Sequence, residues 1–100
     1  MIKILIQKSN DKYVLEAKGH AKSADIGQDL ICAAVSSIIT GGINAIYEKS
    51  KFELKLDEGY ALIKSLEKVN QKDEVVLQTI ETQLKTIEES YSKFIQISYQ

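Results

Sequence analysis

With 100 residues and 44% apolar side chains, the chain can bury a two-layer core but leaves little room for a second module, so we expect one domain over residues 1–100. The formal net charge of -1, and the fact that all 13 cationic side chains are lysine, argue against a surface that binds nucleic acid. No apolar run approaches the roughly 18 residues of a membrane span, and the N-terminal segment lacks the apolar core of a signal peptide, so a cytoplasmic location is expected.

The pattern of residues 2–8 and 13–19 is that of two β-strands. Apolar and polar side chains alternate in both segments, and Ser9-Asn10-Asp11 between them is a cluster typical of turns. These segments are therefore predicted to form a β-hairpin that Gly19 closes. Residues 20–28 break the alternation with small and polar side chains, which predicts an exposed loop of a length that often carries function.

A helix is predicted to begin near Asp29, because aspartate is a favoured N-cap residue. This start would place Cys32 at the third helical position, and the apolar pattern continues to about Lys49. The adjacent glycines Gly41 and Gly42 each cost roughly 1 kcal/mol relative to alanine in a helix, so we interpret them as a sign of close helix–sheet packing or of a kink. The predicted buried stripe consists of Ile31, Ala34, Val35, Ile38 and Ile39.

The second half of the chain predicts two more strands, a helix and a final strand. Apolar side chains alternate with charged ones from Phe52 to Asp57, Glu58-Gly59 is typical of a hairpin turn, and residues 60–66 are the predicted return strand. A second helix is expected after the polar segment 70–73, and residues 94–99 alternate again as the last strand. The inner face of that helix is predicted to carry Val76, Leu77, Ile80, Leu84, Ile87 and Tyr91, and its solvent face Glu81, Lys85, Glu88 and Glu89.

The predicted order of elements is therefore β-β-α-β-β-α-β. A mixed sheet with both helices packed on one face is the simplest arrangement that buries the apolar faces of these elements. The expected fold class is α/β in the broad sense, in the form of a two-layer α+β domain.

The chemically most distinctive residues are His20 and Cys32, the only histidine and the only cysteine of the chain. A single cysteine excludes an internal disulfide, which fits a reducing compartment. One histidine and one cysteine cannot supply the four ligands of a structural zinc site, so no metal or cofactor is expected. A thiolate is a strong nucleophile and an imidazole is its usual base, so the pair is suited to covalent attack on an acyl group.

The expected positions of these residues add to that interpretation. With Cys32 in the first turn of a helix, the free backbone N–H groups of the helix start would favour the thiolate and hold an oxyanion. Asp25 and Asp29 are candidates for a third, orienting group, although Asp29 would also serve as the helix cap. Ser36 lies one turn after Cys32 and could bond near the thiol or back to a helix carbonyl. The structural alternative is that Cys32 is simply a small buried apolar side chain.

Two segments of the chain resemble the signature of the Prp family, the ribosomal-processing cysteine proteases of Firmicutes and related bacteria. These segments are Gly19-His20-Ala21 and Gly27-Gln28-Asp29-Leu30-Ile31-Cys32-Ala33-Ala34-Val35-Ser36. The resemblance extends over essentially the whole chain. It implies a small α/β homodimer that removes a short N-terminal extension from the large-subunit ribosomal protein numbered twenty-seven, with paired aromatic residues before the scissile bond.

On this chain, the resemblance implies that His20 and Cys32 are the catalytic pair and that Gly19, Asp29 and Ser36 complete the signature. It also implies that residues 21–28 form a mobile loop that gates the site. The leading hypothesis is a cytoplasmic cysteine endopeptidase with the ribosomal extension as its partner. The alternatives are a non-enzymatic ribosome-assembly binding protein and a thiol-dependent hydrolase of small esters.

Overall fold

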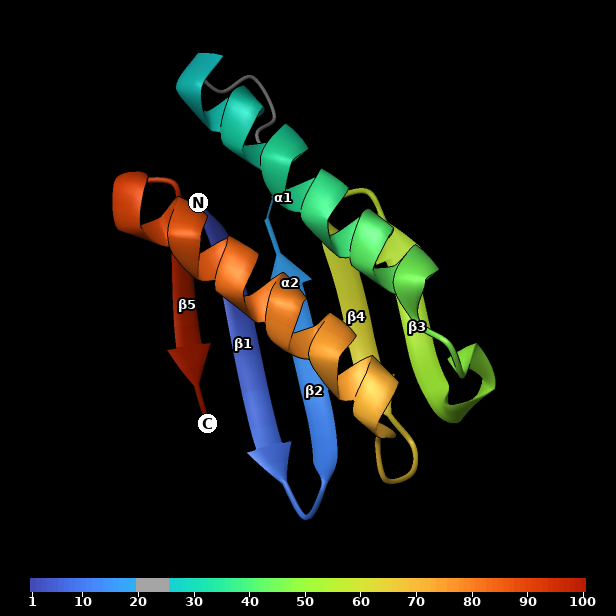
Figure 1. The fold of residues 1–100 in the computed structure, drawn as a ribbon. Coiled ribbons are helices and arrows are strands. Elements are labelled where there is room, and N and C mark those ends of the chain that lie inside the picture. Colours follow the sequence, from blue (N-terminus) through green and yellow to red (C-terminus); the bar gives the residue numbers. More distant parts are fainter. Residues whose placement is uncertain (20–25) are drawn as a thin grey trace.

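The computed structural model describes residues 1–19 and 26–100, with the backbone alone for residues 26–29, and Figure 1 shows a sheet covered on one face by two helices. The strands are β1 (Ile2–Ser9), β2 (Lys12–Lys18), β3 (Phe52–Asp57), β4 (Tyr60–Ser65) and β5 (Ile95–Tyr99). The helices are α1 (Ile26–Ala45) and α2 (Gln71–Ser90), and a short 3-10 helix, η1 (Lys49–Lys51), precedes β3. The predicted order of elements and the two-layer α+β fold are confirmed.

The strands follow the order β3-β4-β2-β1-β5 in the sheet. Strand β5 runs parallel to β1, whereas the other neighbours are antiparallel, so the sheet is mixed. Both predicted hairpins are present. In the first hairpin, Asn10 and Asp11 have φ angles of 50° and 63°, and two such residues in sequence form the tight turn that matches the twist of paired strands.

The core lies between the inner face of the sheet and the two helices. Residues with alternate spacing in the strands point inward, as the two-residue period predicts, and the helices supply side chains from their facing stripes. Burying one isoleucine or leucine side chain contributes about 1.5–3 kcal/mol, so this layer supplies most of the stabilisation. The side chains that are most deeply buried include Ile4, Ile6, Leu15, Ile39, Ile63, Ile80, Leu84 and Ile95. Among the described residues, neither helix is long and apolar enough to cross a membrane.

Helix α1 begins earlier than predicted. It starts at Ile26, so residues 26–28 belong to the helix and not to the predicted loop, whose other residues, 20–25, lie outside the described part of the chain. Asp29 is the fourth helical residue and not the N-cap. The cap preference of aspartate misled the prediction because aspartate is also favourable within the first turn, where its charge meets the positive end of the helix dipole. The predicted buried stripe is confirmed at Ile31, Val35 and Ile39.

Helix α1 also ends earlier than predicted, at Ala45 and not near Lys49. The reason is a buried carboxylate at the start of α2. Asp73 is 0% exposed, and its two oxygens accept hydrogen bonds from the backbone N–H groups of Tyr47 at 2.7 Å and Glu48 at 3.2 Å. These bonds hold the chain after Ala45 in a non-helical path and tie the end of α1 to the start of α2.

The start of α2 is a well-formed N-cap. Asn70 has an extended backbone, and its side-chain oxygen accepts a hydrogen bond from the backbone N–H of Asp73 at 2.8 Å. The Asn70 side chain also donates to the Asp73 carboxylate at 3.0 Å. Asn70 therefore both caps α2 and helps to fix the carboxylate that ends α1. Residues 71–73 of the predicted polar entry already belong to the helix.

The predicted inner face of α2 is confirmed at Leu77, Ile80 and Leu84, but two expectations for this helix are wrong. Tyr91 is 48% exposed, because it is the C-cap residue and lies beyond the last helical turn. Glu81 was expected in solvent but is only 8% exposed. It turns toward the sheet because partners on two strands bind its carboxylate, as described below.

Gly42 lies where helix α1 packs against helix α2. A Cβ atom at this position would collide with the side chain of Ile80, so the predicted close packing exists, but the neighbour is helix α2 and not the sheet. Gly41 differs, because a Cβ there would meet no described atom within 4 Å. The two glycines are therefore a matched pair, one required by packing and one not.

We expect Gly42→Ala to lower the free energy of unfolding by about 1–2 kcal/mol, because overpacking outweighs the gain in helix propensity. Gly41→Ala, its control, is expected to raise the free energy of unfolding by about 0.5–1 kcal/mol. Urea denaturation of both variants measures the difference. A Gly42→Ala variant that gained as much stability as Gly41→Ala would contradict the contact with Ile80.

Candidate active site

A cavity of about 210 Å³ lies between α1 and the end of the sheet where β2 stops and β3 turns into β4. Three residues that the sequence analysis singled out line it together, namely Cys32 and Ser36 from α1 and Gly19 from the end of β2. The spacing of four residues on one helix explains why Cys32 and Ser36 share this face. The other lining residues are Ile2, Ala17, Val35, Ile39, Leu56, Asp57, Glu58, Gly59, Tyr60 and Ala61.

Cys32 is half-buried, with one side packed against the core and another lining the cavity. It is the seventh residue of α1 and not the third, because the helix begins at Ile26. Only the first four N–H groups of a helix are free, so the helix start does not surround the thiol as predicted. The partial exposure and the place in the cavity wall distinguish Cys32 from a fully buried structural cysteine.

Gly19 fixes where the chain leaves the sheet beside this cavity. Its φ angle of +113° is one that residues with a side chain rarely adopt, and a Cβ here would collide with the carbonyl oxygen of Met1. Its N–H donates a hydrogen bond to the carbonyl oxygen of Gly59 at 3.0 Å. The first described segment of the chain therefore ends at the cavity wall, one residue before His20 in the sequence.

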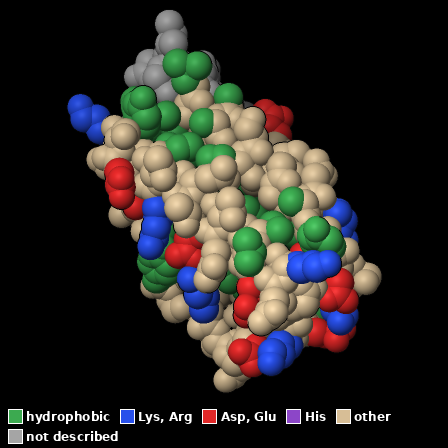
Figure 2. Space-filling view, viewed as in Figure 1, with side chains coloured by type: hydrophobic (Ala, Val, Ile, Leu, Met, Phe, Trp, Pro, Cys, Tyr) green, Lys and Arg blue, Asp and Glu red, His purple; other side chains and the backbone are tan. Residues whose placement is uncertain are grey.

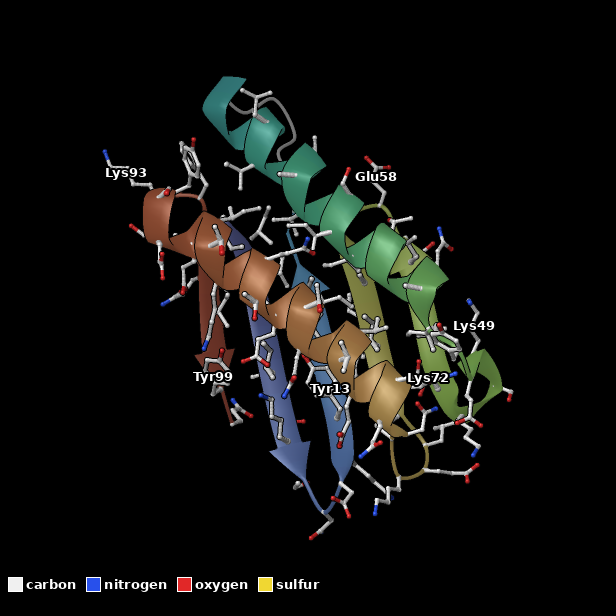
Figure 3. All side chains as sticks on the ribbon, viewed as in Figure 1. Tyr13, Lys49, Glu58, Lys72, Lys93 and Tyr99 are labelled. Atoms are coloured by element: carbon white, nitrogen blue, oxygen red, sulfur yellow. The ribbon has the colours of Figure 1, made fainter. Side chains whose placement is uncertain are left out.

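The turn between β3 and β4 forms a wall of the cavity that sequence reasoning missed. Strand β2 pairs with β4 in a register that places Lys18 opposite Tyr60, so this turn lies beside the end of β2. Figure 3 shows Glu58 extending from the turn next to α1. The Glu58-Gly59 pattern predicted a turn, but no local signal indicated that β4 would be the neighbour of β2. Asp57 and Glu58 are exposed and give this rim negative charge, which favours cationic over anionic ligands.

The remaining predicted site residues are not brought together by described atoms. His20 and Asp25 lie outside the described residues, as do residues 21–25 of the predicted gating loop. The backbone of Asp29 is helical, and its side chain is not described. Contact between His20 and Cys32, and an orienting role for either aspartate, therefore stay predictions. Within residues 1–19 and 26–100, no cluster of three or more histidine, cysteine, aspartate or glutamate side chains could hold a metal ion.

Comparison with known protein families and curated proteins gives matches over nearly the full chain. The family model described as "Cysteine protease Prp" matches residues 1–96. The ribosomal processing cysteine protease Prp of Bacillus subtilis (strain 168) is 33% identical over 108 residues, which cover 98% of this chain and 96% of that protein. The protein of the same name from Mycoplasma genitalium is 41% identical over 101 residues, which cover 98% and 95% of the two chains.

Solved structures agree with these matches. A crystal structure of the essential ribosomal processing protease Prp from S. aureus, in complex with a substrate peptide, superposes with a TM-score of 0.87 at 29% identity and covers all of both chains. A second structure of that protease, with a covalently linked product peptide, gives a TM-score of 0.84 at 30% identity and the same coverage. The whole fold described above, including the position of both helices on one face of the sheet, is thus shared with a protease.

Proposed function

Because the chain belongs to the Prp family of cysteine proteases, we propose that it is the endopeptidase that removes the short N-terminal extension of the large-subunit ribosomal protein numbered twenty-seven. The observation that carries the proposal is that the only cysteine of the chain is half-buried in the wall of a cavity at the end of the sheet. Its relatives are ribosomal processing proteases, and one related structure holds a substrate peptide, which supports a peptide substrate for this chain as well.

In the proposed reaction, His20 takes the proton from the Cys32 thiol, and the thiolate attacks the carbonyl carbon of the scissile peptide bond. The C–N bond then breaks, His20 gives its proton to the departing amine, and the acyl group remains on Cys32 as a thioester. Water that loses a proton to His20 attacks the thioester, which releases the new carboxylate and restores the thiol. In this scheme the His20 imidazole passes the thiol proton to the amine and the water proton back to the sulfur.

The walls of the cavity fit the aromatic residues that the family resemblance implies before the scissile bond. Ile2, Val35 and Leu56 contribute apolar surface, and Tyr60 contributes an aromatic ring. An apolar wall favours apolar side chains over charged ones, because a charged side chain would lose its hydration there. The reaction also needs a reduced thiol, which fits the cytoplasm. The homodimer implied by the resemblance stays a prediction.

The substrate is tested by incubating the protein with the extended ribosomal protein and measuring the product masses. We expect one cleavage that removes the extension after the paired aromatic residues. A matched substrate in which both aromatic residues are alanine should remain intact over the same time. If the extended protein stays uncut, or if both substrates are cut at the same rate, the proposed specificity is wrong.

The role of His20 is tested by the reaction of Cys32 with iodoacetamide at neutral pH. A free thiol is only a few per cent ionised there, so an imidazole that accepts its proton accelerates alkylation. We expect His20→Ala to slow the labelling of Cys32 by about tenfold or more. In denaturant, both proteins should react at the same rate. Equal rates in the folded proteins would exclude His20 as the base of the thiol.

A further inference from the structure

The two edges of the sheet differ in how they are covered. Strands β3 and β5 are the edge strands, so each presents one row of backbone N–H and C=O groups that no neighbouring strand binds. On β5, the carboxylate of Glu88 from α2 accepts a hydrogen bond from the N–H of Ile97 at 2.6 Å, so a side chain occupies part of that edge. In the part of the chain that the structure describes, no side chain is hydrogen-bonded in this way to the edge of β3.

The hydrogen bonds around β3 identify which of its backbone groups face the open edge. The N–H of Leu66 donates to the carbonyl oxygen of Lys51 at 2.9 Å, one residue before β3 begins. In an antiparallel pair, successive residues alternate between bonding to the neighbour and pointing away from it, so Phe52, Leu54 and Leu56 direct their N–H and C=O groups away from β4. The N–H of Phe52 agrees with this assignment, because it donates to a carbonyl of η1 instead. Leu54 and Leu56 therefore present their backbone groups along the open edge.

The same residues carry the apolar side of β3 into the candidate active site. Leu54 packs against the core, whereas Leu56 is 50% exposed and lines the cavity that contains Cys32. Alternation places Glu53 and Lys55 on the opposite face of the strand, where their charged groups lie 3.4 Å apart. Figure 2 shows apolar side chains gathered at the end of the molecule where α1 begins, whereas most charged side chains of this face lie toward the other end. A segment along the open edge would therefore pass from Leu54 to Leu56 and enter the cavity over apolar surface.

We propose that the substrate of the peptidase binds as an added strand on the open edge of β3, with the segment before its scissile bond paired to Leu54 and Leu56. Backbone groups of the extended peptide bond to those of the edge, and its alternate side chains contact the apolar face of β3. Because the cavity lies at the C-terminal end of β3, this segment runs parallel to the strand. The substrate class is an extended segment with apolar side chains at alternate positions. The inference rests on the proposed peptidase function, and the related structure that holds a substrate peptide supports a peptide as the ligand.

The first test uses a synthetic peptide that contains the extension and the cleavage site, with a single N-methyl group placed in turn at each residue before the paired aromatic residues. An N-methyl group removes one N–H donor, and in an added strand only alternate N–H groups face the edge. The loss in kcat/KM should therefore alternate, about tenfold at one residue and less than about twofold at the next.

The outcome of this scan separates the inference from the proposed function. If the unmethylated peptide is cut, but the losses are equal at neighbouring residues or absent throughout, the added strand is wrong and the peptidase function stands. If the unmethylated peptide is neither bound nor cut, the proposed function fails, and the added strand fails with it.

The second test measures amide hydrogen exchange by NMR in the Cys32→Ala variant, with and without the unmethylated peptide. Exchange at the N–H groups of Leu54 and Leu56 should become at least about tenfold slower when the peptide binds, because pairing removes them from solvent. The N–H of Ile97, which a side chain of α2 already binds on the other edge, is the control and should not change. A peptide that produces saturable shifts at Val35 in the cavity wall, but does not slow exchange at Leu54 and Leu56, would contradict the added strand.

A pair of variants at Leu54 tests the edge from the protein side. Leu54→Pro removes one outward N–H and no hydrogen bond to β4, and proline is tolerated in edge strands at such positions. We expect kcat/KM to fall about tenfold, while iodoacetamide alkylates Cys32 at the wild-type rate. Leu54→Val keeps the N–H and should retain kcat/KM within about twofold. A folded Leu54→Pro protein with wild-type kcat/KM would overturn the inference, and the peptide scan decides it if this variant does not fold.

Discussion

Replacing Cys32 with alanine is expected to lower the rate of peptide cleavage by at least about a thousandfold while the fold is retained. The substitution removes the sulfur atom, which no other side chain of the chain can replace as a thiol because Cys32 is the only cysteine. Since the side chain is half-buried and alanine occupies the same helical position well, the loss of stability should stay below about 1–2 kcal/mol. The loss of activity would then reflect chemistry and not unfolding.

Cleavage of the extended ribosomal protein, followed by mass spectrometry, measures this effect. Ser37→Ala is the matched control, because Ser37 is an exposed neighbour on α1 that does not line the Cys32 cavity. It should retain wild-type cleavage. Thermal unfolding of both variants shows whether the fold survives. A folded Cys32→Ala protein that still cleaved at the wild-type rate would remove Cys32 from the mechanism.

Replacing Asp73 with alanine is expected to have the largest effect on stability, a loss of about 3 kcal/mol in the free energy of unfolding. The carboxylate accepts hydrogen bonds from the N–H groups of Tyr47 and Glu48 and from the Asn70 side chain. Without it, these donors are left unpaired, at about 1–3 kcal/mol for each buried one. Removing a buried charge offsets part of that cost, so the net effect is smaller than the sum.

Urea denaturation measures this loss, and two further variants show its origin. Asp73→Asn keeps one acceptor oxygen and should lose less stability than Asp73→Ala. Glu74→Ala changes the next residue, which is exposed, and should alter the free energy of unfolding by less than about 0.5 kcal/mol. An Asp73→Ala protein as stable as Glu74→Ala would mean that the link between α1 and α2 contributes nothing.

The strands were predictable because their signals are local. Alternation with a period of two identified β1, β2, β3 and β5, and the turn chemistry of Glu58-Gly59 identified β4 as the return strand of a hairpin. The ends of α1 were not predictable in the same way. Its C-terminal end depends on Asp73, which lies 28 positions after Ala45 in the sequence. The Asp73 carboxylate accepts hydrogen bonds from the backbone N–H groups of Tyr47 and Glu48, which a longer helix would use within itself. No pattern around residue 45 contains that information.

The inward position of Glu81 has a similar cause. On a helical period, Glu81 lies at the border of the apolar face, and a charged residue there is expected to point to solvent. Lys8 on β1 and Tyr99 on β5 bind it, and these two strands become neighbours only in the folded sheet. Sequence reasoning cannot detect a pairing between residues so far apart in the chain without first knowing the strand order.

Part of the candidate site was predictable from residue types. Sequence reasoning singled out Gly19, Cys32 and Ser36, which line one cavity, while the catalytic roles of His20 and Cys32 stay predictions. The wall formed by the turn after β3 depends on the pairing of β2 with β4, which is a property of the whole sheet. Cys32 was predicted at the third helical position because Asp29 was predicted to be the N-cap. The helix begins at Ile26, so both predictions are wrong.

The proposal that Cys32 attacks the peptide bond is tested most directly by measuring cleavage as a function of alkylation. Because the chain has one cysteine, iodoacetamide modifies a single thiol, and the intact mass gives the modified fraction. Cleavage of the extended ribosomal protein should fall in proportion to that fraction and reach zero at one label per chain. Fully alkylated protein that still removed the extension would contradict the proposal.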